Sequence, residues 1–212
     1  MRFRLLTVLA LGLLGAQSAH AVIVDGKDWR QLTETTGFSW LNVNAACGSG
    51  LCSGSIGGTL LDGWQWADNS DVASLFDSLI QPGSTQFPTA TASYAAAGDA
   101  DIANAVTNIF TATSVFNPAG NAWREVRGIT RSSANGATSL AYLSDSPFAN
   151  SLDYAAFDTT WPTNLGDDTT GIWLYKPAVT PVPVPEPGVL ALCGAAFMGW
   201  LFVRRKTPLT AC

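Results

Sequence analysis

Histidine is almost absent from this chain of 212 residues, which contains only His20. His20 belongs to an N-terminal segment that is expected to be removed, for reasons given below, so the mature protein would have no histidine at all. Without an imidazole, Ser-His-Asp and Cys-His catalysis and histidine-ligated zinc are excluded. Any chemistry in this protein therefore has to come from other side chains.

Basic residues are also scarce. Between Val22 and Pro185 there are six basic residues against fifteen acidic ones, which gives this part a net charge of −9. A protein that neutralises phosphates needs clustered Lys and Arg, so nucleic-acid binding is not expected. An acidic surface suits solubility and leaves room for a divalent cation.

The N-terminal segment 1–21 reads "MRFRLLTVLALGLLGAQSAHA". Arg2 and Arg4 supply a short positive region, an apolar stretch follows, and Ala-His-Ala forms a small-x-small cleavage site. This order is typical of a secretory signal peptide. We therefore expect export, with Val22 as the mature N-terminus.

The C-terminal segment combines prolines, an apolar run and a basic cluster in "VPVPEPGVLALCGAAFMGWLFVRRK". The apolar run from Val189 to Val203 has 15 residues, against the roughly 20 that cross a typical bilayer. We expect a membrane helix over residues 188–203. The positive charges that follow favour a cytoplasmic location for the tail 207–212.

The order Pro-Glu-Pro, apolar helix, basic cluster resembles the PEP-CTERM sorting signal of Gram-negative bacteria. The resemblance covers Val184 to Lys206, with the sorting signal itself at 186–206, and it implies these sorting residues: Pro185, Glu186, Pro187, Arg204, Arg205 and Lys206. Proteins with this signal are held in the inner membrane with their domain in the periplasm, and an exosortase then processes them. The resemblance thus implies an exosortase partner, a final place on the outer surface or in the extracellular matrix, and a link to exopolysaccharide and biofilm.

Residues 22–176 are long enough for one domain with its own core, and the proline-rich stretch 177–185 reads as an extended spacer. Cys47 and Cys52 lie in the Gly/Ser-rich segment "ACGSGLCSG" of an exported protein. Cysteines in an oxidising compartment pair readily, so we expect a disulfide between them.

Periodicity and turn signals predict a mixed α+β domain with N-terminal helices and a C-terminal antiparallel sheet. Helices are expected over 40–47 after the cap residue Ser39, over 72–80 after Asn69-Ser70-Asp71, and over 99–110 from Asp99. Strands are expected over 28–36, 59–67, 122–131, 137–145, 153–161 and 169–177. The Asn135-Gly136 pair predicts a tight hairpin between two of them.

Part of this pattern resembles a second family. The helix "FSWLNVNAAC", the Gly-rich segment after it and "GWQWADNSDVASLFDSL" are similar to the first half of C-type-lectin-like domains, over residues 38–80, and "GIWLYK" at 171–176 would be the closing strand. The resemblance implies that fold. The calcium-ligand triplets of the lectins are absent, so calcium-dependent sugar binding is not implied.

Tryptophans are the most suggestive site residues. Trp40, Trp64, Trp66 and Trp173 fall in predicted helices or strands, where large aromatics form the core. Trp161 stands in the predicted loop "TTWPTNLGDD" and is the candidate for an exposed glycan contact.

Two aspartates in the same loop, Asp167 and Asp168, offer oxygen ligands that could hold calcium weakly, but a solvated turn is the favoured interpretation. No other metal or cofactor is indicated.

The sequence favours a non-enzymatic cell-surface or matrix protein that associates with extracellular polysaccharide. One alternative is an exported hydrolase that uses carboxylates, with Glu34 or Glu125 as the glutamates available in the domain. Another is a purely structural or adhesive surface protein with no small ligand.

Overall fold

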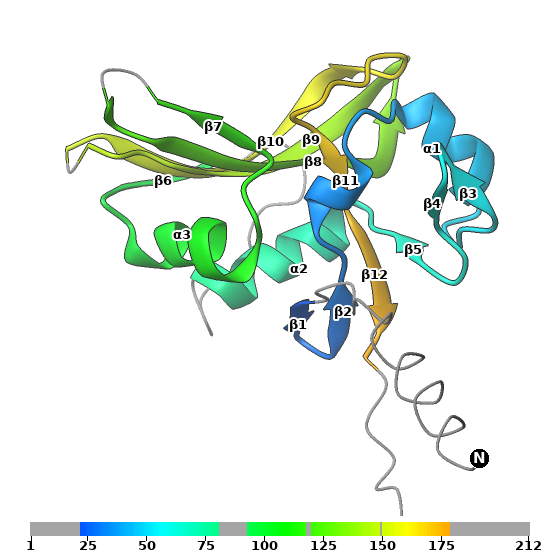
Figure 1. Cartoon of the computed structure of the whole chain (residues 1–212), viewed down its shortest axis with the longest axis horizontal. Helices are drawn as coiled ribbons and strands as arrows, with labels where there is room; N and C mark the ends of the chain where they lie inside the picture. Colours follow the sequence, from blue (N-terminus) through cyan, green and yellow to red (C-terminus); the bar gives the residue numbers. More distant parts are fainter. Residues whose placement is uncertain (1–21, 81–92, 118–119, 149, 179–212) are drawn as a thin grey trace, which may run out of the picture. The chain divides into compact units, whose positions relative to one another are not determined.

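The computed structural model describes residues 22–80, 93–117, 120–148 and 150–178 (Figure 1). The chain separates into a unit that ends at Ala178 and a second unit from Val179 to Cys212, and all the described residues belong to the first. The predicted signal peptide, sorting signal and membrane helix lie outside the described residues. Within the described part, no helix combines the length and apolarity needed to cross a bilayer.

The described residues form a mixed α+β structure in which antiparallel strands predominate, as the sequence predicted. The largest sheet has the order β11-β8-β9-β10-β6, and β7 pairs with β8 beside that path. Its strands are β6 (Ser93–Ala97), β7 (Ser114–Phe116), β8 (Trp123–Ala134), β9 (Ala137–Asp145), β10 (Leu152–Pro162) and β11 (Gly171–Ile172). The turn between β8 and β9 has positive φ at both Asn135 (54°) and Gly136 (78°), which confirms the predicted Asn-Gly hairpin.

A second sheet joins the beginning and the end of the described chain. Its order is β1-β2-β12-β5, and a two-stranded hairpin, β3-β4, lies apart from it. The strands are β1 (Val22–Val24), β2 (Lys27–Trp29), β3 (Ser55–Ile56), β4 (Thr59–Leu60), β5 (Gln65–Trp66) and β12 (Leu174–Pro177). Between β11 and β12 stands the single residue Trp173, so the chain passes from one sheet to the other across this tryptophan.

The helices begin where side-chain oxygens meet free backbone N–H groups. Helix α1 (Trp40–Cys47) has the predicted cap, with Ser39 accepting from the N–H of Asn42. Helix α3 (Ala100–Asn104), continued by the π-helical turn η3 (Ala105–Ile109), begins after Asp99 as predicted. Helix α2 (Asn69–Ile80) differs in one detail: Asp68, one residue before the predicted group, accepts from the N–H groups of Ser70 and Asp71.

The core lies between the large sheet and the helices α2 and α3, which Figure 1 shows on the same, lower side of that sheet. Trp173 is fully buried at its centre and makes edge contacts with the rings of Trp29, Phe76 and Phe110 at 5.5–6.1 Å between centroids. Its indole N–H donates to the carbonyl oxygen of Ala141. A second cluster, which includes Trp64, Trp66 and the partly buried Trp40, lies around α1. The predicted core assignment of Trp40, Trp64, Trp66 and Trp173 is therefore confirmed.

Three predicted strands were too long. In place of the predicted strand 28–36, the structure has the short strand β2, Lys27–Trp29. A 3-10 helix, η2 (Leu32–Thr35), follows it, and Thr35 Oγ1 donates a hydrogen bond back to the carbonyl of Leu32. The segment 59–67 divides into β4 and β5 at a turn closed by Trp64 N–H and Leu61 O. The segment 169–177 divides into β11 and β12.

Candidate functional site on the open face of the large sheet

The two faces of the large sheet have different surroundings, although the same three strands make both. In β8, β9 and β10 the partners Val126, Leu143 and Ala155 point toward α2 and α3, and each is fully buried. Successive residues of a strand point to opposite faces. The neighbouring partners Glu125, Ser144 and Tyr154 therefore point to the other side.

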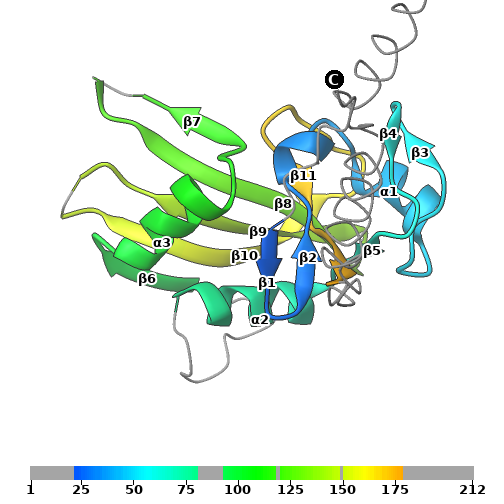
Figure 2. The ribbon, with the colours of Figure 1, turned by 60° about the horizontal axis from the view of Figure 1, so that its bottom comes forward.

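That other side carries aromatic side chains at regular positions. Ile129 and Leu140 at one end of this side are buried in the cluster around α1, and Tyr142 and Trp161 pack against that cluster. The polar and aromatic residues of this side in the register are the set that we name the open face: Phe116, Trp123, Glu125, Arg127, Tyr142, Ser144, Tyr154, Asp158 and Trp161. Phe116 is 67% exposed, and the other four aromatics are partly exposed. Figure 2, seen with α2 and α3 turned forward, shows both helices lying across the opposite face.

A line of polar contacts crosses the open face from one tryptophan to the other. The indole N–H of Trp123 donates to Ser144 Oγ at 2.6 Å, and Ser144 Oγ donates to Glu125 Oε1 at 3.3 Å. The other oxygen of Glu125 lies 3.6 Å from the guanidinium of Arg127.

The line ends at Trp161. The guanidinium carbon of Arg127 stands 5.5 Å from the ring centroid of Trp161, which is within the range of a cation–π contact. Trp123 and Arg127 are four residues apart on β8, so the line spans about 13 Å of strand. The open face is therefore long enough for a chain ligand and already holds its polar groups in place.

Tyr142 lies in the middle of the open face and is partly buried. Its pKa is raised above 10.0, first by burial and then by the nearby carboxylates of Glu125 and Asp158, which disfavour a second negative charge. The phenol is therefore protonated at neutral pH. It presents a flat ring with a hydroxyl group that can donate or accept a hydrogen bond.

Trp161 was predicted both as the last residue of the strand 153–161 and as part of a loop, and the structure confirms the strand. The residue belongs to β10, where it pairs with Thr138, because β10 extends through Pro162 after a bulge between Asp158 and Trp161. The side chain is partly buried, and its indole nitrogen is buried with no hydrogen-bond partner in the described part of the chain. Trp161 is thus fixed between Arg127 and the cluster around α1, with part of its ring exposed, rather than standing free in a loop.

Asp167 is held within its own turn. Its Oδ1 accepts from both the N–H and the hydroxyl of Thr169 at 2.8 Å, and its carbonyl accepts from Gly37 N–H at 2.7 Å. Burial by itself would raise the pKa of Asp167, but the bonds from Thr169 to its carboxylate and the nearby charge of Arg127 outweigh it and hold the pKa below 3.8. Asp168 is exposed beside it. Among the described residues no three Asp, Glu, His or Cys side chains come together in a group that could hold a metal.

The two glutamates of the alternative hydrolase stand on different elements, and each has a cationic neighbour. Glu34 in η2 accepts from Arg30 at 2.8 Å, while Glu125 on β8 faces Arg127. Glu125 alone lies on the open face. Cys47 and Cys52 form the predicted disulfide, and both are buried in the cluster around α1.

No family model, curated protein or solved structure matches this chain. The site has therefore to be judged from its own geometry. Sequence reasoning singled out Trp161 and Glu125 but missed Trp123, Tyr142 and Tyr154. The spacing Trp123-x-Glu125-x-Arg127 in a strand was a usable signal, because it puts these three side chains on one face.

Proposed function

We propose that this is an exported surface or matrix protein that binds extracellular polysaccharide on the open face of its large sheet. The observation that carries the proposal is the row of partly exposed aromatic rings joined by a fixed line of polar groups. Aromatic rings offer flat apolar surfaces to the C–H faces of sugar rings, and the polar groups between them can bond to hydroxyls.

The charge distribution favours a neutral polysaccharide. Glu125 and Asp158 are balanced on the open face by Arg127 alone, and the domain as a whole is acidic. A strongly anionic polymer would therefore be repelled, whereas hydroxyl groups can bond to carboxylate and guanidinium alike.

The proposed location rests on the two ends of the sequence. A signal peptide over 1–21 and a PEP-CTERM-type signal over 186–206 would deliver the domain to an exosortase and then to the surface. The C-type-lectin-like fold is a further proposal, supported by the succession of α1, a Gly-rich segment, α2 and a closing strand β12.

The test is a depletion assay with the host's own extracellular polysaccharide. Protein is mixed with the polymer and centrifuged, and the fraction lost from solution is measured for the wild type, Trp123→Ala and Trp161→Ala. Buried aromatic anchors at interfaces contribute about 2 kcal/mol, so each change should weaken binding roughly 30-fold. Phe148→Ala, an aromatic 46% exposed in the loop after β9, is the matched control and should bind as the wild type does.

Three other outcomes would replace the proposal. If both tryptophan variants bind as tightly as the wild type, the binding site does not lie on the open face. No depletion at all would leave a structural or adhesive protein. Shortening of the polymer that stops with Glu125→Gln would establish the hydrolase instead. Repeating the assay with a chelator tests calcium at Asp167 and Asp168.

A further inference from the structure

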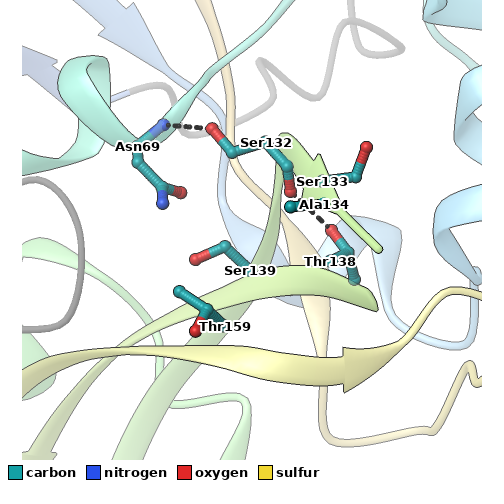
Figure 3. Close-up of a pocket in the computed structure, with 7 residues that line it drawn as sticks. All are labelled: Asn69, Ser132, Ser133, Ala134, Thr138, Ser139 and Thr159. Carbon is teal, nitrogen blue, oxygen red and sulfur yellow. Dashed lines mark hydrogen bonds between the residues drawn. The ribbon is translucent and has the colours of Figure 1, made fainter. Parts of the chain in front are cut away.

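A small pocket lies at the end of the large sheet where the β8–β9 hairpin meets the start of α2 (Figure 3). Its volume is about 190 Å³. Seven residues line it: Asn69, Ser132, Ser133, Ala134, Thr138, Ser139 and Thr159. None of them belongs to the open face, so the pocket is a separate feature of the molecule.

Two bulges create the pocket. On β9 a single residue, Ser139, separates Thr138 from Leu140. The partners of these two residues on β8, Ser133 and Ile129, are separated by three residues. Their partners on β10, Trp161 and Asp158, are separated by two. Both neighbouring strands therefore carry extra residues at the level of Ser139, and neither gives it a partner in the register. Bulges of this kind open a ladder and redirect side chains, and they are common next to binding sites.

Ser139 is the unusual residue of this pocket. It is only 2% exposed, and its Oγ has no hydrogen-bond partner in the described part of the chain. Figure 3 shows it between Asn69 and Thr159. A buried hydroxyl without a partner is costly and rare in native proteins, so a group that comes from outside the chain should complete it.

The surrounding polar groups are already fixed in position. Asn69 N–H donates to Ser132 Oγ at 3.0 Å, and Thr130 Oγ1 donates to Asn69 Oδ1 at 2.6 Å. With its oxygen occupied, Asn69 presents its Nδ2 group, which donates to no other described residue. The pocket thus offers an amide donor and several hydroxyls, and no charged side chain lines it.

Size and chemistry together define the ligand. A single water occupies about 30 Å³ of liquid, whereas pockets for drug-sized ligands have about 300–1,000 Å³. We propose that this pocket binds one neutral, hydroxyl-rich unit of about the size of a single sugar ring, with Ser139 Oγ and Asn69 Nδ2 bonding to its hydroxyls. The unit is either a free sugar or polyol or the end of a polysaccharide chain.

The experiment is equilibrium dialysis of the full chain, purified in detergent, against radiolabelled glucose, galactose, mannose and myo-inositol. Glucuronate and glucosamine serve as charged controls. We expect saturable uptake of at least one neutral probe with a Kd of about 1 mM or tighter, and none of the charged ones. Absence of saturable uptake of all four neutral probes would overturn the proposal.

Two substitutions tie uptake to the pocket. Ser139→Ala removes one hydroxyl without adding volume and should weaken uptake about three- to tenfold, the usual range for one hydrogen bond. Ala134→Leu fills the exposed mouth and should abolish uptake. Ser74→Ala, on the exposed side of α2, is the control. Uptake that Ser139→Ala and Ala134→Leu leave unchanged would also overturn the proposal.

The source of the ligand and the independence of the two sites are tested together. Extracellular polysaccharide is added to the Trp123→Ala variant after it has been loaded with the labelled sugar. Displacement of the label identifies a chain end as the occupant, and retention identifies a free sugar. Because this variant has lost the proposed contact on the open face, the label reports on the pocket alone. The pocket can therefore be tested even if the open face does not bind polysaccharide.

Discussion

The covered and open faces of the large sheet are made by the same strands, yet between the helices and the α1 cluster they carry different kinds of side chain. On the covered face Val126, Leu143 and Ala155 have no exposed area and contact the helices. On the open face Glu125, Ser144 and Tyr154 occupy the neighbouring register positions; Glu125 and Tyr154 keep partial access to solvent, whereas Ser144 is buried beneath its hydrogen-bond partners.

The difference separates two tasks within one element. Burial of apolar groups on one face stabilises the fold, while the polar and aromatic groups on the other face are available to bind a ligand. Substitutions one residue apart should then affect stability or binding, but not both. The following predictions test this separation.

The largest effect is expected for Phe157→Ala on the covered side of β10. Phe157 is 6% exposed and packs against Phe76 at 5.8 Å between centroids, so its loss should cost about 3–5 kcal/mol of unfolding free energy. Urea denaturation followed by tryptophan fluorescence measures it. Tyr154→Ala on the same strand should cost about 1 kcal/mol or less. Similar losses for the two variants would show that the open face also stabilises the fold.

A smaller loss of stability is expected for Gly128→Ala in β8. A Cβ at this position would lie 2.5 Å from Leu32 Cδ2 and 2.8 Å from Trp173 Cδ1. Overpacking of this kind costs about 1–3 kcal/mol. Thermal unfolding gives the change, and polysaccharide binding below the unfolding temperature should be unaltered. Loss of binding in the folded variant would mean that the two faces are coupled through β8.

The preceding residue, Arg127, lies on the open face, and its substitution should affect binding more than stability. Arg127→Ala removes a guanidinium that can bond to a sugar hydroxyl, worth about 0.5–1.5 kcal/mol, and should weaken polysaccharide binding about two- to tenfold. Loss of its contact with Trp161 should lower the free energy of unfolding by only about 0.5–1 kcal/mol. Arg124→Ala, whose side chain pairs with Asp145 instead, serves as the control for the loss of one positive charge. Equal weakening by both changes would assign the effect to net charge.

The smallest effect at neutral pH is expected for Tyr142→Phe, which becomes visible only in alkali. Since the folded pKa of Tyr142 is raised above 10.0, the stability that comes from keeping this phenol protonated is complete below pH 10 and is lost as pH rises through the folded pKa. The phenylalanine variant should lose less stability over that range. Urea unfolding on both sides of pH 10 measures this, and identical pH profiles would contradict it.

Much of the fold was predictable because local signals decide it. Ser39, Asp99 and the Asn135-Gly136 turn act on their immediate neighbours, and each gave the expected element. The hairpin of β1 and β2 was missed although Asp25-Gly26 is the same kind of signal, with positive φ at both residues. Strand β6 was missed because its run of alanines has low β-propensity, so tertiary pairing with β10 decides its structure.

The candidate site was only half predictable. Alternation places Trp123, Glu125 and Arg127 on one face of a strand, but it does not tell which face the helices will cover. That choice depends on the packing of α2 and α3 against Val126 and Leu143, which are far from them in sequence. The pocket at Ser139 was beyond prediction, because it results from bulges on two different strands.

The passage of the chain from β11 through Trp173 to β12 also has a mechanical consequence. β12 is held between β2 and β5, and β11 is hydrogen-bonded to β8, which carries Trp123 and Arg127. If the protein is tethered beyond Ala178 and grips a polymer on its open face, tension between the two runs through Ile172, Trp173 and Leu174, all fully buried. A pull directed along β12 would load its hydrogen bonds to both neighbours in shear, together, rather than open them one at a time.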